Sequence, residues 1–165
     1  MATSMDGYIA DENGGVDWLE PLNAVDLGFE TFFSEISTVI MGRSTYEQVR
    51  GFGLEWAYPG KTAIIVSSHP LKDLPPETTQ WTDGIEPLIR YLRQLEEDDV
   101  WIVGGAQLQS AFFDLGALDK LDLFIIPVTL EKGVPLTPSL EQLKPLPVTA
   151  TEQYDMGVVR KEYRF

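Results

Sequence analysis

The chain has 165 residues, of which 44% are hydrophobic and 23% are charged, so it is long enough for one domain with a sizeable core. Its 26 acidic and 12 basic residues give a formal net charge of -14, which argues against a general nucleic-acid binder. The absence of cysteine excludes disulfides, thiolate metal sites and a cysteine nucleophile, and favours the cytoplasm. The apolar runs are too short to span a membrane and the start lacks a signal-peptide pattern, so no membrane partner is expected.

The first predicted elements are a loop and a helix. Residues 11–17, "DENGGVD", contain two glycines and an Asn-Gly pair, which predict a loop ahead of Trp18. Two interpretations remain open: a mobile loop that closes over a ligand, or an ordinary surface loop with Trp18 anchored in the core. Residues 26–36 have the apolar spacing of a helix, with Leu27, Phe29, Phe32, Phe33 and Ile36.

Four short runs predict strands that are buried on both faces. They are almost continuously apolar and rich in β-branched residues, and they cover 38–41, 62–66, 100–103 and 121–126. Helical spacing over 84–97 and 105–115 alternates with the strands, and Gly116 follows the point where the second helix would end. This alternation predicts right-handed crossovers and a mostly parallel sheet, in an α/β fold.

The C-terminal part has a different pattern. Residues 127–147 contain Pro127, Pro135, Pro138, Pro145 and Pro147, which predict a long irregular connection. The segments "VTATEQYD" and "GVVRKEYRF" flank residues 155–157 and predict a terminal antiparallel hairpin. We therefore expect a single domain over residues 1–165.

Three predicted strand ends carry residues suited to binding phosphate. "GRST" (42–45) and "GGAQL" (104–108) each follow a strand and precede a helix, where glycine permits close approach and the helix offers free N–H groups. "SSH" (67–69) follows a third strand and offers hydroxyls. Each turn can also be an ordinary tight connection, and neither glycine turn matches the GxGxxG pattern. His69 is the only histidine, so no metal site is expected.

The motifs "TSMDGYIA", "VDWL", "VIMGRSTYE", "YPGKTAIIVSSHP", "VWIVGGAQL" and "LFIIPV" occur in this order along nearly the whole chain. Together they resemble dihydrofolate reductases, and more closely the dihydrofolate-reductase-like family that includes the reductase domain of riboflavin biosynthesis. The resemblance implies a three-layer fold. In it, helices flank a mixed, mostly parallel sheet of about eight strands that ends in an antiparallel hairpin, and NADPH lies across the strand ends.

The resemblance also implies site residues. Arg43 with its neighbours would hold phosphates at a helix start, while Ser67, Ser68 and His69 would lie near the adenosine 2′-phosphate. The implied cofactor contacts are Ala2, Ile9, Ala10, Gly42, Arg43, Ser44, Thr45, Ser67, Ser68, His69, Val103, Gly104, Gly105, Ala106, Gln107 and Leu108. The implied substrate contacts are Asp6, Trp18, Asp26, Phe29 and Pro127.

Asp26 is the catalytic candidate. It precedes Gly42 by sixteen residues, as the active-site carboxylate does in bacterial dihydrofolate reductases. A carboxylate there could hydrogen-bond an amino-pyrimidine ring and assist protonation, with its pKa raised by burial. The alternative is that Asp26 caps a helix that begins at Leu27.

Two segments depart from the family pattern. Few apolar residues precede "TSMDGYIA", so the first strand is expected to be short or truncated. This bears on the role of Ala2 as an implied cofactor contact. In "PVTLEKGVPLTPSL" (127–140), Glu131 and Lys132 replace small residues on what the resemblance implies is the substrate side.

The resemblance implies an NADPH-dependent oxidoreductase that reduces a pteridine or an aminopyrimidine-type substrate, most like 5-amino-6-(5-phosphoribosylamino)uracil reductase. Three alternatives stay open: a dihydrofolate reductase proper, in which Arg50 could bind the folate glutamate; a non-catalytic NADPH-binding module; and an α/β domain without a cofactor. A homodimer is compatible with the family, and a small-molecule substrate is the expected partner.

Overall fold

The structure is a computed structural model that describes residues 1–53, 56–95, 99–136 and 146–165. Its backbone contacts divide the chain into two compact units. The terminal unit joins Met1–Gly28 to Leu118–Phe165, and the middle unit is Phe29–Ala117. Pro138 and Pro145 of the predicted irregular connection lie outside the described residues. The expectation of one domain over residues 1–165 stays a prediction.

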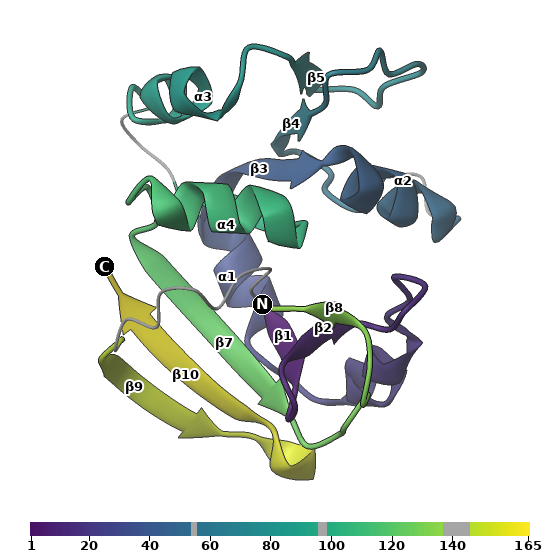
Figure 1. Cartoon of the computed structure of the whole chain (residues 1–165), viewed down its shortest axis with the longest axis vertical. Helices are drawn as coiled ribbons and strands as arrows, with labels where there is room; N and C mark the ends of the chain where they lie inside the picture. The colour runs from purple at the N-terminus through teal and green to yellow at the C-terminus, as the bar shows by residue number, and fades with distance from the viewer. Residues whose placement is uncertain (54–55, 96–98, 137–145) are drawn as a thin grey trace. The chain divides into compact units, whose positions relative to one another are not determined.

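A four-stranded parallel sheet lies in the middle unit, and Figure 1 labels three of its strands, β5, β4 and β3. Its order is β5 (Thr78–Trp81), β4 (Thr62–Val66), β3 (Ile36–Gly42) and β6 (Asp99–Gly104). The three strands predicted in this unit are confirmed as β3, β4 and β6, with β3 and β6 slightly longer than expected. The edge strand β5 was not predicted, because "TTQW" is polar and half-exposed and lacks the apolar run of a central strand.

The core of the middle unit lies on its central strands. Val39, Met41, Ala63 and Ile65 are fully buried and pack with the rings of α1 and of the segment before β4. Within this layer the Trp101 ring meets Phe32 and Tyr58 edge-on, with ring centroids 5.1 and 5.7 Å apart. Each buried large apolar side chain contributes about 1.5–3 kcal/mol, so these central strands form a rigid platform for the loops at their ends.

The described residues of the middle unit form the helices α1 (Phe29–Glu35), α2 (Arg43–Gly51), α3 (Ile85–Leu92) and α4 (Ala106–Asp114). The end of α4 at Gly116 is confirmed, because Gly116 has a left-handed φ of 62° and its N–H donates to the Phe113 carbonyl. The predicted start of the first helix is wrong. Gly28 has a left-handed φ of 74° and its N–H donates to Asp26, so the helix begins at Phe29.

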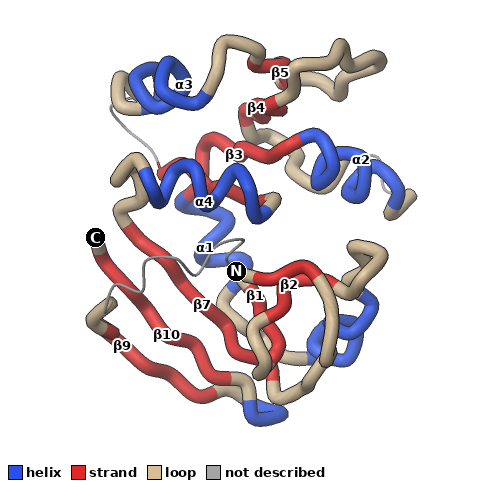
Figure 2. The backbone as a smooth tube through the Cα atoms, viewed as in Figure 1, coloured by secondary structure: helices blue, strands red, loops and turns tan. Residues whose placement is uncertain are grey.

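The terminal unit contains a mixed four-stranded sheet (Figure 2). Its order is β1 (Ala2–Ser4), β7 (Lys120–Ile126), β10 (Val159–Arg164) and β9 (Val148–Gln153). Strand β1 runs parallel to β7, and the other two pairs are antiparallel, so the predicted C-terminal hairpin of β9 and β10 is confirmed. Its connection is the short turn η2 (Asp155–Gly157), in which Met156 has a φ of 58°.

A two-stranded sheet and a 3₁₀ segment complete the described part of the terminal unit. Strand β2 (Tyr8–Ala10) pairs with β8 (Val134–Pro135), and the 3₁₀ segment η1 (Asp17–Ala24) carries Trp18 and Leu22 onto a core that includes Ile126 and Val158. The predicted mixed α/β class with a parallel sheet, added antiparallel strands and flanking helices is confirmed. Among the described residues, the strands are distributed over sheets of four, two and four.

Candidate cofactor site at the strand ends

The phosphate-binding candidates follow three neighbouring parallel strands of the middle unit. Gly42 ends β3, Gly104 ends β6, and Ser67 directly follows β4. Because β4, β3 and β6 are adjacent and parallel, their carboxyl ends meet at one edge of the sheet. That edge is where open α/β sheets bind ligands.

The two glycine turns lie in close contact. A Cβ on Gly42 would be 3.8 Å from the Gly105 nitrogen, and Cβ atoms on Gly104 and Gly105 would lie 3.2 and 3.3 Å from Thr45 Oγ1. The peptide bond between Gly104 and Gly105 is cis. The absence of side chains at these positions lets two backbone turns and the start of α2 share one small space.

Both helices that leave these turns begin without a side-chain cap. Gly42 is the N-cap of α2 and Gly105 is the N-cap of α4. The first N–H groups of an α-helix lack an intrahelical partner, so a phosphate can accept from them. Ala106, Gln107 and Leu108 form the first turn of α4, where Gln107 is exposed and Leu108 is buried.

Arg43 is the first residue of α2 and is 43% exposed. Its Nε donates to Glu47 Oε1 at 2.6 Å, one helical turn further along. Ser44 beside it is exposed, while Thr45 is half-buried against the glycines. Glu47 was not singled out in the sequence, although the i,i+4 spacing to Arg43 predicts such a pair.

The turn after β4 is held by its own hydrogen bonds. Ser67 is buried, and its hydroxyl donates to the His69 carbonyl at 2.8 Å and accepts from the His69 N–H at 3.2 Å. Ser68 and His69 are exposed, and Ser68 Oγ lies 3.2 Å from His69 Nδ1. The Ser67 hydroxyl therefore closes the turn, and Ser68 and His69 are the groups that face solvent.

The remaining implied cofactor contacts are one residue of β6 and three residues of the terminal unit. Val103 is half-buried on β6 in the middle unit. Ala2, Ile9 and Ala10 belong to strands β1 and β2 of the terminal unit. Ala10 is buried, and its carbonyl occupies the space that a Cβ on Gly133 would need.

Asp26 lies on the chain just before α1. Its side chain is exposed, and its Oδ1 accepts from the Gly28 N–H at 2.8 Å. Since α1 begins at Phe29, Asp26 closes a turn before the helix and does not cap a helix at Leu27. Phe29, an implied substrate contact, is 53% exposed and stacks on Phe33 with ring centroids 5.5 Å apart.

Asp6, another implied substrate contact, joins distant parts of the terminal unit. Its carboxylate accepts from Ser4 Oγ at 2.6 Å and from the backbone N–H groups of Leu130 and Glu131 at 3.2 and 2.8 Å. The Ser4 hydroxyl, followed by the N–H donors, lowers the pKa of Asp6. These bonds fasten the turn after β1 to the segment that carries Glu131 and Lys132.

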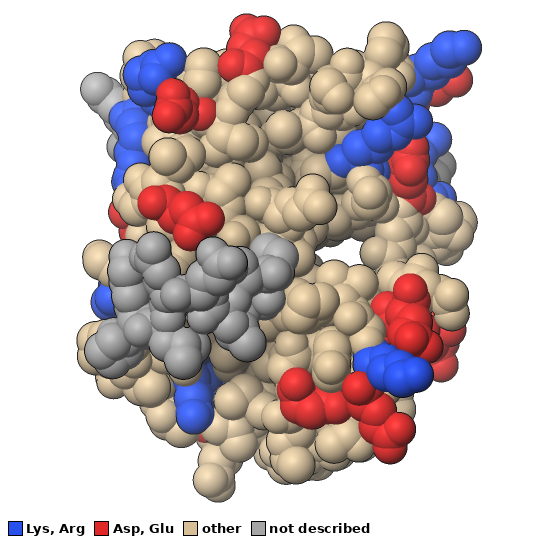
Figure 3. Space-filling view, viewed as in Figure 1, with Lys and Arg blue, Asp and Glu red and all other residues tan. Residues whose placement is uncertain are grey.

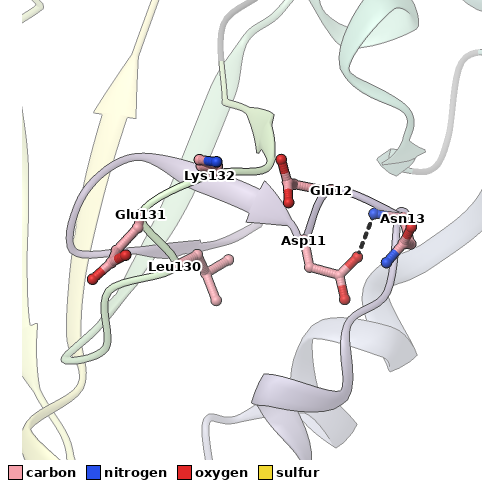
Figure 4. Close-up of a pocket in the computed structure, with 6 residues that line it drawn as sticks. All are labelled: Asp11, Glu12, Asn13, Leu130, Glu131 and Lys132. Carbon is pink, nitrogen blue, oxygen red and sulfur yellow. Dashed lines mark hydrogen bonds between the residues drawn. The ribbon is translucent and has the colours of Figure 1, made fainter.

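A hollow of about 320 Å³ lies beside that segment (Figure 4). Leu130 lines it from the segment between β7 and β8, and Asp11 lines it from the loop after β2, where Asp11 Oδ1 accepts from the Asn13 N–H at 2.7 Å. The predicted loop 11–17 therefore begins with a hydrogen-bonded turn, which Gly15 also joins by donating to Asp11. The lining residues are Asp11, Glu12, Asn13, Leu130, Glu131 and Lys132.

Trp18 and Pro127, the other implied substrate contacts, also belong to the terminal unit. Trp18 is half-buried against the core, which supports the interpretation as a core anchor, and its buried Nε1 has no partner among the described residues. Pro127 is exposed at the end of β7.

Figure 3 shows acidic and basic side chains interspersed on one face, most of whose drawn surface is uncharged. Among the described residues, no His, Asp or Glu side chains gather in a group of three that could hold a metal ion. The described part of the chain has no helix with the length and apolarity required to cross a bilayer.

The fold and the strand-end turns define a protein of the dihydrofolate-reductase-like class. A family model described as the RibD C-terminal domain matches residues 1–159, so the chain belongs to that family.

Two relatives and several solved structures are similar. The uncharacterized protein YwjB of Bacillus subtilis (strain 168) is 33% identical over 159 residues, covering 96% of this chain and 91% of YwjB. The uncharacterized protein YyaP of the same strain is 28% identical over 177 residues, covering 100% and 92%. A putative riboflavin biosynthesis protein from Shewanella sp. PV-4 has a TM-score of 0.86 at 27% identity, over 99% of this chain and 95% of that one.

Two more distant structures share the fold. A deaminase/5-amino-6-(5-phosphoribosylamino)uracil reductase from Thermotoga maritima has a TM-score of 0.72 at 20% identity, over 99% of this chain and 54% of that one. Dihydrofolate reductase from Enterococcus faecalis, complexed with NADP(H), has a TM-score of 0.65 at 22% identity, over 99% and 92%. At these identities, both neighbours show the fold that this chain shares.

Proposed function

We propose that the chain is an NADPH-dependent reductase that transfers hydride to a C=N or C=O carbon of a pteridine or aminopyrimidine-type substrate. The observation that carries the proposal is the edge of the middle sheet. There, turns after β4, β3 and β6 lie on adjacent parallel strands, and two of them lead into helices without side-chain caps.

The residues at this edge fit a dinucleotide. The backbone N–H groups at the starts of α2 and α4 would bind phosphates, and Arg43 would add a positive charge. The glycines let the two turns pack closely against the start of α2, because a side chain on Gly104 or Gly105 would press against Thr45. NADPH would supply the hydride.

In the substrate half-reaction, the carbon that accepts the hydride gains two electrons and the adjacent nitrogen or oxygen gains a proton. Asp26 is the proposed proton source or relay, and its Oδ2 is not used by the bond that the Gly28 N–H makes to Oδ1. The nearest activity is reduction of 5-amino-6-(5-phosphoribosylamino)uracil, which is named for the Thermotoga maritima neighbour. Reduction of dihydrofolate is the second candidate, supported by the carboxylate that stands just before α1.

Calorimetry with NADPH and NADH tests the cofactor proposal. Wild-type protein should bind NADPH, and Arg43→Ala should raise its Kd about 10-fold or more, since a charge-assisted hydrogen bond contributes about 1.5–3 kcal/mol. Arg50→Ala is the matched control, because Arg50 lies in the last turn of the same helix and is exposed. Absence of nucleotide binding to the wild type would overturn the proposal, and equal effects of the two substitutions would remove Arg43 from the site.

NADPH oxidation with each candidate substrate tests the chemistry. Turnover with the phosphoribosylaminouracil and none with dihydrofolate supports the first candidate, and the reverse result supports the second. Tight NADPH binding without turnover of any pteridine, aminopyrimidine or small carbonyl compound would show a non-catalytic binding module.

A further inference from the structure

Gln80 on β5 holds the turn that follows β4. Its Nε2 donates to the carbonyl oxygens of Ser67 and His69, both at 2.8 Å, and its Oε1 accepts from the Leu71 N–H at 3.0 Å. A carboxamide has two N–H donors and one carbonyl acceptor, and here a single side chain bonds three backbone groups of one short segment.

The register of the sheet explains why this support comes from β5. Ile65 of β4 pairs with Gln80, and Val66 pairs with Trp81. The last backbone bond between these segments runs from the Ser67 N–H to the Trp81 carbonyl at 3.1 Å. Beyond it the chain leaves the sheet, and the Gln80 amide extends the pairing to Leu71.

The supported turn presents two exposed polar side chains at the candidate cofactor site. Ser68 offers a hydroxyl and His69 a ring nitrogen, 3.2 Å apart. They follow β4, which is adjacent to β3 and therefore to the turn that carries Arg43. A turn whose backbone is fixed by three side-chain bonds presents such groups from one backbone arrangement, so the backbone loses little conformational freedom when a ligand binds.

We propose that Gln80 is a positioning residue that shapes the Ser68–His69 turn for the 2′-phosphate of NADPH, and so sets the preference for NADPH over NADH. The proposal rests on the cofactor role proposed above for this edge of the sheet. Gln80 acts through the turn and does not touch the nucleotide. A purely structural role would instead change the binding of both nucleotides equally.

The test is calorimetry with NADPH and with NADH on wild type, Gln80→Met and Thr79→Val. Methionine has a similar length without the amide, and Thr79 is an exposed neighbour on the same strand. Gln80→Met should raise the Kd for NADPH about 10-fold, as expected for an indirect loss of about one to two net hydrogen bonds, and should change the Kd for NADH less than about 2-fold. Thr79→Val should change neither value.

A second series separates positioning from stability. In the background Ser68→Ala/His69→Ala, Gln80→Met should have little further effect on NADPH, because residues that act as one unit are not additive. If Gln80→Met does not fold, Gln80→Asn, which keeps the amide but is shorter, must show the same selective loss. Failure of wild type to bind either nucleotide refutes the proposed function. Equal wild-type affinities for NADPH and NADH, or equal effects of Gln80 substitution on both, refute this inference alone.

Discussion

Glu47 is the residue that most directly limits what Arg43 can do. The two side chains form an ion pair at 2.6 Å on the first turns of α2, and they are 43% and 55% exposed. Exposed pairs of this kind contribute about 0.2–1 kcal/mol. A phosphate that binds Arg43 therefore meets a weak competitor, and it also meets the negative charge of Glu47 as a near neighbour.

Substitution Glu47→Gln should lower the Kd for NADPH by about 2- to 5-fold, because it removes the carboxylate that competes for Arg43. The ion pair that is removed contributes less than about 1 kcal/mol, which limits the size of the change. Calorimetry at low salt measures the change. Glu86→Gln, in the first turn of α3, is the control, since it removes the same charge elsewhere in the middle unit. Weaker binding by Glu47→Gln would show that Glu47 helps to orient Arg43 and does not compete with the cofactor.

At the scale of elements, the close packing around Gly104 at the end of β6 predicts how a substitution there changes stability. Gly104→Ala should destabilise the protein by about 1–3 kcal/mol, because the new Cβ would lie 3.2 Å from Thr45 Oγ1. Denaturant unfolding measures the loss. Thr45→Ala in the same chain should restore most of it by removing the atoms that the Cβ meets. A loss that persists in the double variant would place the strain elsewhere.

The segment before β8 contains a tighter contact. Gly133→Ala should cost about 1–3 kcal/mol or more, since its Cβ would overlap the Ala10 carbonyl where β2 pairs with β8. Gly51→Ala is the matched control, because no atom lies within 4 Å of its Cβ and it ends α2 in a helical conformation. The control should be neutral or slightly stabilising in thermal unfolding. Equal losses in both variants would contradict the contact.

These elements show which parts of the structure could be predicted from sequence. Strands β3, β4 and β6 were predicted because each contains a nearly continuous apolar run, although the side chains of β6 are only half-buried. Strand β5 was missed because it is a polar edge strand whose role is carried by Gln80. The predicted start of α1 was wrong because Gly28, with its left-handed φ, interrupts an apolar pattern that is otherwise helical.

The candidate site also has features that could be predicted from the sequence and features that could not. Its glycine turns were located because a strand, a glycine and a helix start leave a local pattern. The hydrogen bonds that hold the turns are different. The bond from Leu71 to Gln80 depends on the register between strands, and the bonds from Leu130 and Glu131 to Asp6 join segments far apart in the sequence. No local pattern contains that information.

At the scale of the whole molecule, carboxyl groups of the terminal unit with a lowered pKa, among them Asp6, Glu152 and Glu162, make stability depend on pH. Hydrogen bonds from Arg164, followed by other donors, lower the pKa of Glu162 to about 2, and the Ser4 hydroxyl leads the donors that lower the pKa of Asp6. A carboxyl whose pKa is lower when folded stabilises the protein above its ordinary pKa. That stability is lost as the pH falls through the lower value.

We therefore expect the free energy of unfolding to fall as the pH is lowered from about 4.5 to about 2. The ordinary and the shifted pKa of Glu162 set this window. Glu162→Gln should reduce the slope in this window, as measured by urea unfolding at several pH values. Lys161→Gln should leave the slope unchanged, because alternate strand residues point to opposite faces and Lys161 is the neighbour of Glu162 on β10. An unchanged slope in Glu162→Gln would assign the acid sensitivity to other carboxyl groups.

The division of the chain into a terminal and a middle unit has a consequence for synthesis. The middle unit is one continuous stretch, Phe29–Ala117, so its whole parallel sheet can assemble while the ribosome is still adding residues. Strand β1 precedes the middle unit in the chain but pairs with β7, which follows it, as Ala2 with Phe124, and Asp6 meets Leu130. The residues of β1 must therefore wait, unpaired, until the middle unit and β7 have been synthesised.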